Sequence, residues 1–246
     1  MYINNINILY YLAIGIIGLV VGRLIEWCII RLPDYKKVFV REFFTYIKSN
    51  SPKYIYMIIT AILYLGILYL NGIGIATLEY MILIPMLICV FIIDYKQKII
   101  PNRLNFSIFE VGLVFTFIQG VTNVNIAIDR LLGMLVGGGI FLFITFVGSL
   151  ITGKEAMGFG DVKLMGGLGL FFGWRTIIII SLMAFLLGAI VGIILMIVKK
   201  KNGEEYMPFG PFIVIATIIA IFAPFDLLLF IMLKIFTLGT YNINAA

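Results

Sequence analysis

The chain contains no histidine, two cysteines and few charged residues. Only 12% of its 246 residues are charged, and Cys28 and Cys89 both lie in apolar stretches. Without histidine, the chain cannot form a Ser-His-Asp triad or a zinc site with His ligands. Two cysteines in apolar runs also provide neither a disulfide framework nor a Cys-rich zinc site. Catalysis by carboxylates remains compatible with this composition.

Hydrophobic residues make up 63% of the chain, which is more than a soluble domain could cover. Several nearly uncharged runs are long enough to cross about 30 Å of hydrocarbon as helices. Strand-like alternation is absent. We therefore predict an all-α, polytopic transmembrane helical bundle of about eight spans, forming a single membrane-embedded domain over residues 1–246. The expected spans lie near residues 6–30, 54–71, 76–93, 104–121, 126–151, 162–173, 174–198 and 210–238.

Lysine and arginine are concentrated on one side of these spans. Fourteen of the 18 fall in or beside the connectors 31–53, 94–103, 152–161 and 199–209. Because cytoplasmic loops are enriched in Lys and Arg, this side is expected to be the cytoplasm, with the N-terminus outside. The distribution of these charges, and not the net charge of +6, therefore predicts the orientation in the plasma membrane, and we expect the lipid bilayer, not nucleic acid, as a partner.

Asp94 and Asp161 differ from the other acidic residues because each lies where an apolar span meets a cytosolic connector. An ionisable residue at a membrane span is costly and suggests a function. On the predicted topology, both carboxylates reach the same membrane face. Six other acidic residues are interpreted as solvated charges: Asp34, Glu42, Glu79, Asp129, Glu204 and Glu205.

Two carboxylates that meet share a proton, so one can act as a base toward water while the other acts as an acid toward a carbonyl. This is the chemistry of aspartic proteases, and it needs no histidine or metal. From the residues alone, two alternatives stay open: a proton or ion pathway, and a structural role.

The glycines beside Asp161 fall into two groups. Gly158 and Gly160 flank Phe159 and give the backbone freedom at the entrance to a helix, where a peptide could approach closely. The later glycines are predicted to allow close helix packing: Gly166, Gly167 and Gly169. The segment lacks the spacing of a phosphate-binding loop.

Four blocks along the chain resemble the type IV prepilin peptidases, which are GxGD-type intramembrane aspartic proteases. They are GRLIEWCIIRLP at 22–33, DYKQKIIPN at 94–102, GFGDVKL at 158–164 and PFGPF at 208–212. The resemblance implies hydrolysis of the basic leader of type IV prepilins or pseudopilins at the cytosolic membrane boundary. A presenilin-type protease is disfavoured, because Asp94 starts a Lys-rich connector and does not lie inside a Tyr-Asp span.

The resemblance also implies roles for individual residues. Asp94 and Asp161 correspond to the catalytic pair. Further motif or substrate-facing positions are Gly158, Phe159, Gly160, Lys163, Pro101, Asn102, Pro208, Gly210 and Pro211. The near-complete set of motifs argues against an inactive scaffold. The alternative is a membrane carrier or channel that uses the two aspartates as a proton relay.

The chain departs from the family pattern in two segments. Many members have two Cys-x-x-Cys pairs in the first cytoplasmic loop, but residues 31–53 contain no cysteine, so no zinc is predicted. Residues 51–64 resemble the block associated with methyl transfer, yet Ile55 and Ile58 stand where that block usually has Pro and Glu. We expect peptidase activity without a cofactor, and S-adenosylmethionine only if methyltransferase activity is retained.

Overall fold

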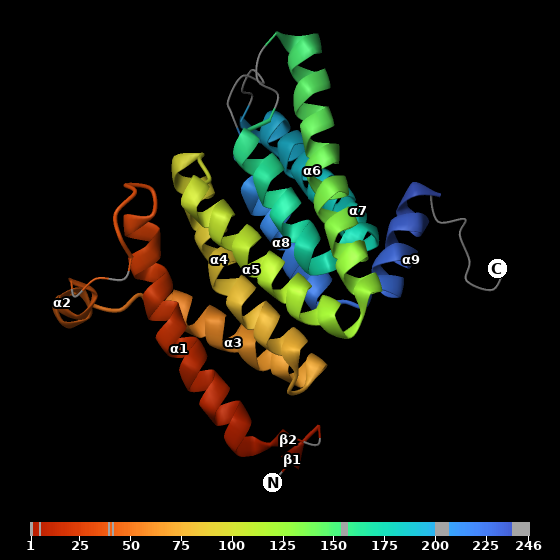
Figure 1. Ribbon diagram of the computed structural model, residues 1–246. Helices are drawn as coiled ribbons and strands as arrows, with labels where there is room; N and C mark the ends of the chain where they lie inside the picture. The colour runs from red at the N-terminus through yellow and green to blue at the C-terminus, as the bar shows by residue number, and fades with distance from the viewer. Residues whose placement is uncertain are drawn as a thin grey trace. The chain divides into compact units, whose positions relative to one another are not determined.

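The computed structural model describes residues 2–4, 6–38, 40, 42–153, 157–199 and 207–237, which are mostly helical (Figure 1). The chain divides into two compact units, Met1–Ile108 and Phe109–Ala246, with the boundary inside helix α5 (Asn102–Thr122). Within the described part, six helices are long and apolar enough to cross a membrane. The predicted all-α, polytopic architecture is confirmed.

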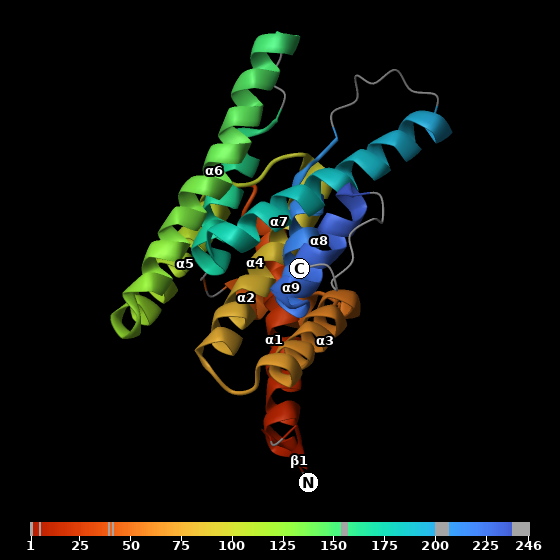
Figure 2. The ribbon, with the colours of Figure 1, turned by 90° about the vertical axis from the view of Figure 1, so that its right-hand side faces the viewer.

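Unit 1 is built from three long helices, α1 (Ile8–Arg31), α3 (Tyr54–Asn71) and α4 (Ile75–Gln97). Figure 2 shows α3 lying against α1. Glycines permit this approach, because a Cβ added at Gly18 would lie 2.6 Å from the Cα of Ala61. A short antiparallel pair, β1 (Tyr2–Ile3) and β2 (Ile6–Asn7), precedes α1. The sequence did not predict this pair.

A polar and aromatic cluster joins the short helix α2 (Glu42–Ser49) to the end of α1. Arg23 and Glu26 form an ion pair, and the Tyr46 hydroxyl donates a hydrogen bond to Glu26 at 3.2 Å. The Trp27 ring lies 5.0 Å from that of Tyr46 and 5.9 Å from that of Phe43. Burial raises the pKa of Tyr46, and the negative charge of Glu26 adds to this effect. Tertiary contacts with α1 thus position α2, none of whose residues is fully buried.

Unit 2 is organised around close packing of α6 (Val124–Thr152) against α7 (Phe159–Lys199). A Cβ added at Gly137 would lie 2.6 Å from the Met165 carbonyl oxygen, and one at Gly169 would lie 2.5 Å from the Met134 nitrogen. A Cβ at Gly166 would contact Gly138 at 3.8 Å. The packing role predicted for Gly166 and Gly169 is therefore confirmed; Gly167 is buried in the same segment.

Two breaks divide the C-terminal helices. Gly173 has φ +73° and ψ 173° inside α7, and it separates the two spans predicted at 162–173 and 174–198. The predicted segment 210–238, whose form the sequence left open, forms α8 (Gly210–Phe222) and α9 (Phe225–Phe236) up to residue 237. Pro224 precedes α9, and its ring prevents α8 from continuing. Residue 238 lies outside the described residues.

Candidate functional site

Asp94 lies in the last turn of α4, where its side chain is almost completely buried and the residue is 2% exposed. The helix ends at Gln97 because Lys98 takes a left-handed conformation, and the Lys98 N–H donates to the Asp94 carbonyl at 2.8 Å. The next residue, Tyr95, is 68% exposed. A buried carboxylate therefore sits at the end of an apolar helix.

Pro101 and Asn102 lie at the other end of the same connector. The Pro101 carbonyl accepts hydrogen bonds from the N–H groups of Leu104 and Asn105 at 3.0 and 3.2 Å, and α5 starts at Asn102. Arg103 donates to the Tyr35 carbonyl at 2.6 Å, and its guanidinium lies 5.6 Å from the Tyr35 ring centre. Within unit 1, the connector after Asp94 is thus fixed to the segment that follows α1.

Asp161 lies in the first turn of α7 in unit 2, and it is 4% exposed. Its N–H donates to the Gly158 carbonyl at 3.0 Å, which closes the first turn of the helix. The amino end of a helix favours negative charge, because the N–H groups of the first turn point out of that end and carry partial positive charge. Gly158 and Gly160 are half-buried on either side of Phe159.

Phe159 and Lys163 contact each other on the surface of the first turns of α7. The Lys163 ammonium lies 5.2 Å from the Phe159 ring centre, a cation–π distance, and Phe159 is 56% exposed. The sequence assigned Lys163 to the motif but predicted no role for its side chain. The structure shows that it contacts the motif's exposed aromatic ring.

The PFGPF block forms the start of α8. Gly210 and Pro211 are buried and helical, and Pro208 is half-buried just before the helix. Proline is well accommodated in the first turn of a helix, because the N–H that it lacks has no partner there. The Phe209 ring packs 5.2 Å from Phe185, within an aromatic cluster of unit 2. The substrate contact predicted for Pro208, Gly210 and Pro211 stays a prediction.

Apart from the PFGPF block at the start of α8, the structure places the candidate residues in two groups. Asp94, Pro101 and Asn102 belong to one connector of unit 1, and Gly158 to Lys163 occupy the start of α7 in unit 2. Each group contains one buried aspartate. That the two carboxylates meet stays a prediction.

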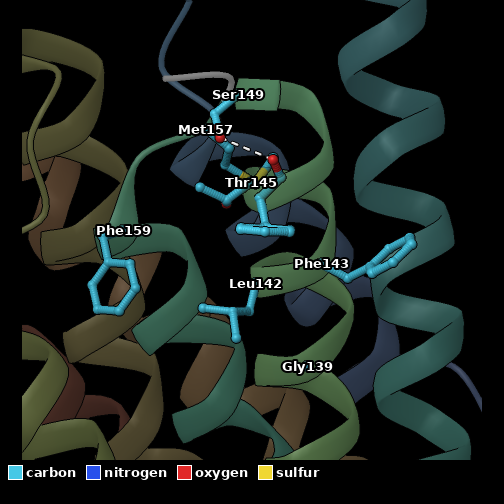
Figure 3. Close-up of a pocket in the computed structure, with 8 residues that line it drawn as sticks. Gly139, Leu142, Phe143, Thr145, Ser149, Met157 and Phe159 are labelled. Carbon is cyan, nitrogen blue, oxygen red and sulfur yellow. Dashed lines mark hydrogen bonds between the residues drawn. The ribbon is translucent and has the colours of Figure 1, made fainter. Parts of the chain in front are cut away.

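An apolar groove of about 530 Å³ lies beside the GFGD motif in unit 2 (Figure 3). Figure 3 shows Leu142 pointing from α6 toward Phe159, with Met157 beside Thr145 and Ser149. The groove is lined by Gly139, Leu142, Phe143, Thr145, Phe146, Ser149, Met157 and Phe159. The sequence did not predict this groove, although the spacing of its α6 residues is typical of one helix face.

Two acidic residues are buried where the sequence did not predict it. Glu79 in α4 is 0% exposed, so its interpretation as a solvated boundary charge is wrong, because neighbouring helices cover it. Glu26 was not singled out, yet it is 3% exposed. Asp34 and Glu42 are exposed as predicted. Glu204 and Glu205 lie outside the described residues.

In the described ranges, no group of three or more His, Cys, Asp or Glu side chains is placed to hold a metal ion.

Comparison with known proteins shows where the similarity lies. Residues 81–193 match the type IV leader peptidase family. The curated Prepilin leader peptidase/N-methyltransferase of Aeromonas hydrophila is 30% identical over 164 residues, which cover 67% of this chain and 56% of that protein.

Two further relatives carry the same name. The protein of Aeromonas salmonicida (strain A449) is 32% identical over 60% of this chain and 50% of its own length, and that of Pseudomonas putida is 32% identical over 59% and 51%. The chain thus spans about half the length of the curated relatives it matches. No solved structure matches it. Both aspartate blocks lie inside the matching region, and the resemblance of this chain to the type IV prepilin peptidases is confirmed.

Proposed function

We propose that this protein is a prepilin leader peptidase that hydrolyses the basic leader of type IV prepilins or pseudopilins at the cytosolic membrane boundary. The similar proteins from Aeromonas and Pseudomonas are named for this activity. The observation that carries the proposal is that each of the two matched motif blocks holds a buried aspartate at the end of an apolar helix.

In this proposal, Asp94 and Asp161 act together as an aspartic endopeptidase of the intramembrane GxGD type. One carboxylate takes a proton from water, and the water oxygen attacks the scissile carbonyl carbon. The other, protonated carboxyl donates a hydrogen bond to the carbonyl oxygen as its negative charge develops. When the tetrahedral intermediate collapses, the amine leaves with a proton, and the two aspartates again share one proton.

The proposed orientation in the plasma membrane follows from the distribution of charge. The N-terminus lies outside and both aspartates face the cytosol, where the leader of a prepilin is located. The substrate offers a basic leader, a small residue and then a hydrophobic helix. The hydrolysis requires no cofactor. S-adenosylmethionine would serve only a methyl transfer, which the relatives' names include.

The proposal is tested by co-expression with a candidate prepilin, followed by mass measurement of the product's N-terminus. We expect Asp94→Asn and Asp161→Asn each to insert normally and to abolish cleavage, because each removes one member of the proton-sharing pair. Asp34→Asn is the matched control, since Asp34 is an exposed aspartate paired with Lys36 at 2.8 Å. Full cleavage by either Asp94→Asn or Asp161→Asn would refute the dyad.

The same experiment distinguishes the remaining activities. A product heavier by one methyl group would show that methyl transfer is retained. A carrier that uses the two aspartates as a proton relay predicts acid-dependent ion flux in proteoliposomes and no processing of any prepilin. Flux without processing would therefore replace the peptidase proposal.

A further inference from the structure

Helix α2 presents three different faces. Phe43 and Tyr46 face α1, where both rings pack against Trp27. Phe44 and Ile47, three residues apart on a second face, are 74% and 40% exposed. The third face is polar and exposed, and it carries Glu42, Thr45 and Ser49. An exposed apolar face beside a polar one is typical of a helix that lies in a bilayer interface.

The contacts between α1 and α3 give the depth of α2. Gly22 of α1 packs against Met57 of α3. Four residues further along α1, the Glu26 carboxylate accepts a hydrogen bond from the Lys53 N–H at 3.4 Å, just before α3 begins. Tyr46 of α2 donates to the same carboxylate at 3.2 Å. Helix α2 therefore lies level with the first turn of α3, where the apolar span meets the polar connector 31–53.

An apolar pocket of about 490 Å³ opens between α1 and the segment that carries α2, and its volume is typical of pockets that bind small molecules. Its lining side chains are all aliphatic or aromatic: Val20, Val21, Leu24, Val38, Val40, Phe43 and Phe44. Val20 lies six residues, or about 9 Å, before Glu26 along α1, so the pocket extends from α2 toward the apolar part of the span. Without polar side chains to satisfy, the pocket suits a hydrocarbon chain.

The connector that carries α2 is strongly basic. Residues 31–53 contain six Lys or Arg and only two acidic residues, Asp34 and Glu42. Both acidic residues are already paired, Asp34 with Lys36 at 2.8 Å and Glu42 with Arg31 at 2.6 Å. Three further lysines of the connector are exposed: Lys37, Lys48 and Lys53. Positive charge at the edge of a bilayer attracts anionic headgroups.

We propose that α2 lies in the membrane interface and, together with α1, binds one anionic phospholipid. One acyl chain occupies the apolar pocket, and the phosphate lies beside Lys48 and Lys53. Lys48 follows Ile47 on α2, and Lys53 directly precedes α3, so both lysines belong to the level of the interface. This lipid site is independent of the proposed peptidase activity, because none of its residues belongs to the blocks around Asp94 and Asp161.

The first test fills the pocket. Val21→Trp places a ring in it, whereas Ile17→Trp places the same ring one turn earlier on α1, at a 51% exposed position outside the pocket. The full chain is reconstituted in vesicles of equal phosphatidylglycerol and phosphatidylcholine, extracted in mild detergent and weighed by native mass spectrometry.

We expect the wild type and Ile17→Trp to retain one phosphatidylglycerol. Val21→Trp should retain about tenfold less, because the ring displaces buried methylene groups that each contribute about fourfold to the affinity. Equal retention by both variants would overturn the pocket assignment. Equal retention of phosphatidylcholine and phosphatidylglycerol by the wild type would overturn the choice of an anionic lipid.

The second test changes the charge and leaves the pocket intact. In the same vesicles, Lys48→Gln and Lys53→Gln should each lower the affinity for phosphatidylglycerol about fivefold, which corresponds to the contribution of one lysine at an anionic surface. The matched variants Lys48→Arg and Lys53→Arg keep the charge and should bind like the wild type. Glutamine variants that retain as much phosphatidylglycerol as the arginine variants would refute the headgroup site.

The third test locates α2 without altering either the pocket or the lysines. A photoreactive phenylalanine analogue in place of Phe44 should cross-link to phosphatidylglycerol in these vesicles. The same analogue in place of the neighbouring Thr45, which is exposed on the polar face, should not. Equal lipid cross-linking at both positions would show that α2 has no membrane-facing side. With prepilin co-expressed, cross-links from Phe44 to prepilin instead of lipid would assign this face to a protein partner and overturn the proposal.

Discussion

Removing the carboxylate of Glu26 should strongly destabilise unit 1. The side chains of Arg23 and Glu26 are 9% and 4% exposed, and they form an ion pair. Glu26 also accepts hydrogen bonds from the Tyr46 hydroxyl at 3.2 Å and from the Lys53 N–H at 3.4 Å. This one carboxylate therefore holds α1, α2 and the segment before α3 together.

The size of the effect follows from what each substitution leaves buried. Glu26→Leu leaves the Arg23 guanidinium buried without its carboxylate, so the free energy of unfolding should fall by about 3–5 kcal/mol. The double variant Arg23→Met with Glu26→Leu removes both charges and should regain most of this loss. Glu42→Leu is the matched control, because Glu42 is 70% exposed in its pair with Arg31 and should change stability by about 1 kcal/mol or less.

Unfolding can be followed through Trp27, which lies inside this cluster. The chain has two tryptophans, so Trp174→Phe leaves Trp27 as the single indole reporter. The Trp27 Nε1 donates to the Val38 carbonyl at 2.8 Å, and its fluorescence should change when α2 separates from α1. Unfolding is measured in detergent at increasing denaturant. A Glu26→Leu variant as stable as its parent, or a double variant no better than the single one, would refute the reasoning.

Other predictions concern packing and metal independence. Gly137→Ala should lower the free energy of unfolding by about 1–3 kcal/mol, because its Cβ would lie 2.6 Å from the Met165 carbonyl oxygen. Gly139→Ala should leave the free energy of unfolding unchanged or raise it by up to about 1 kcal/mol, because the added Cβ meets nothing within 4 Å and alanine favours the helix. Equal thermal unfolding of the two variants would contradict this. Treatment with a metal chelator should leave thermal unfolding and prepilin cleavage unchanged, because residues 31–53 contain no cysteine. A loss on chelation that added zinc restores would show a metal site formed elsewhere.

The membrane-spanning helices could be predicted because their apolar runs are long and uninterrupted. The break at Gly173 was predictable as well, since a glycine between two apolar runs permits the positive φ observed there. Helix α2 was not predicted. Its eight residues are too few to form a stable helix alone, and contacts between Trp27 and Tyr46 hold it in place.

The acidic residues show which burial can be predicted from the sequence and which cannot. Asp94 and Asp161 were found because a carboxylate at the end of an apolar run is costly wherever its neighbours lie. Glu79 was misjudged because position along a helix indicates depth but not whether other helices cover the side chain. For Glu26 a sequence signal existed, since Arg23 stands three residues earlier, the spacing at which helical ion pairs form.

The packing of α6 on α7 links the groove to the motif aspartate within unit 2. A Cβ added at Gly138 would lie 3.6 Å from the Cα of Gly166 and 3.9 Å from the Val162 carbonyl oxygen, next to Asp161. Most of the groove lining lies on α6. The groove therefore cannot move relative to the Asp161 turn unless α6 and α7 separate. Contacts between small residues thus hold the first turns of α7, which contain Asp161, against the middle of α6.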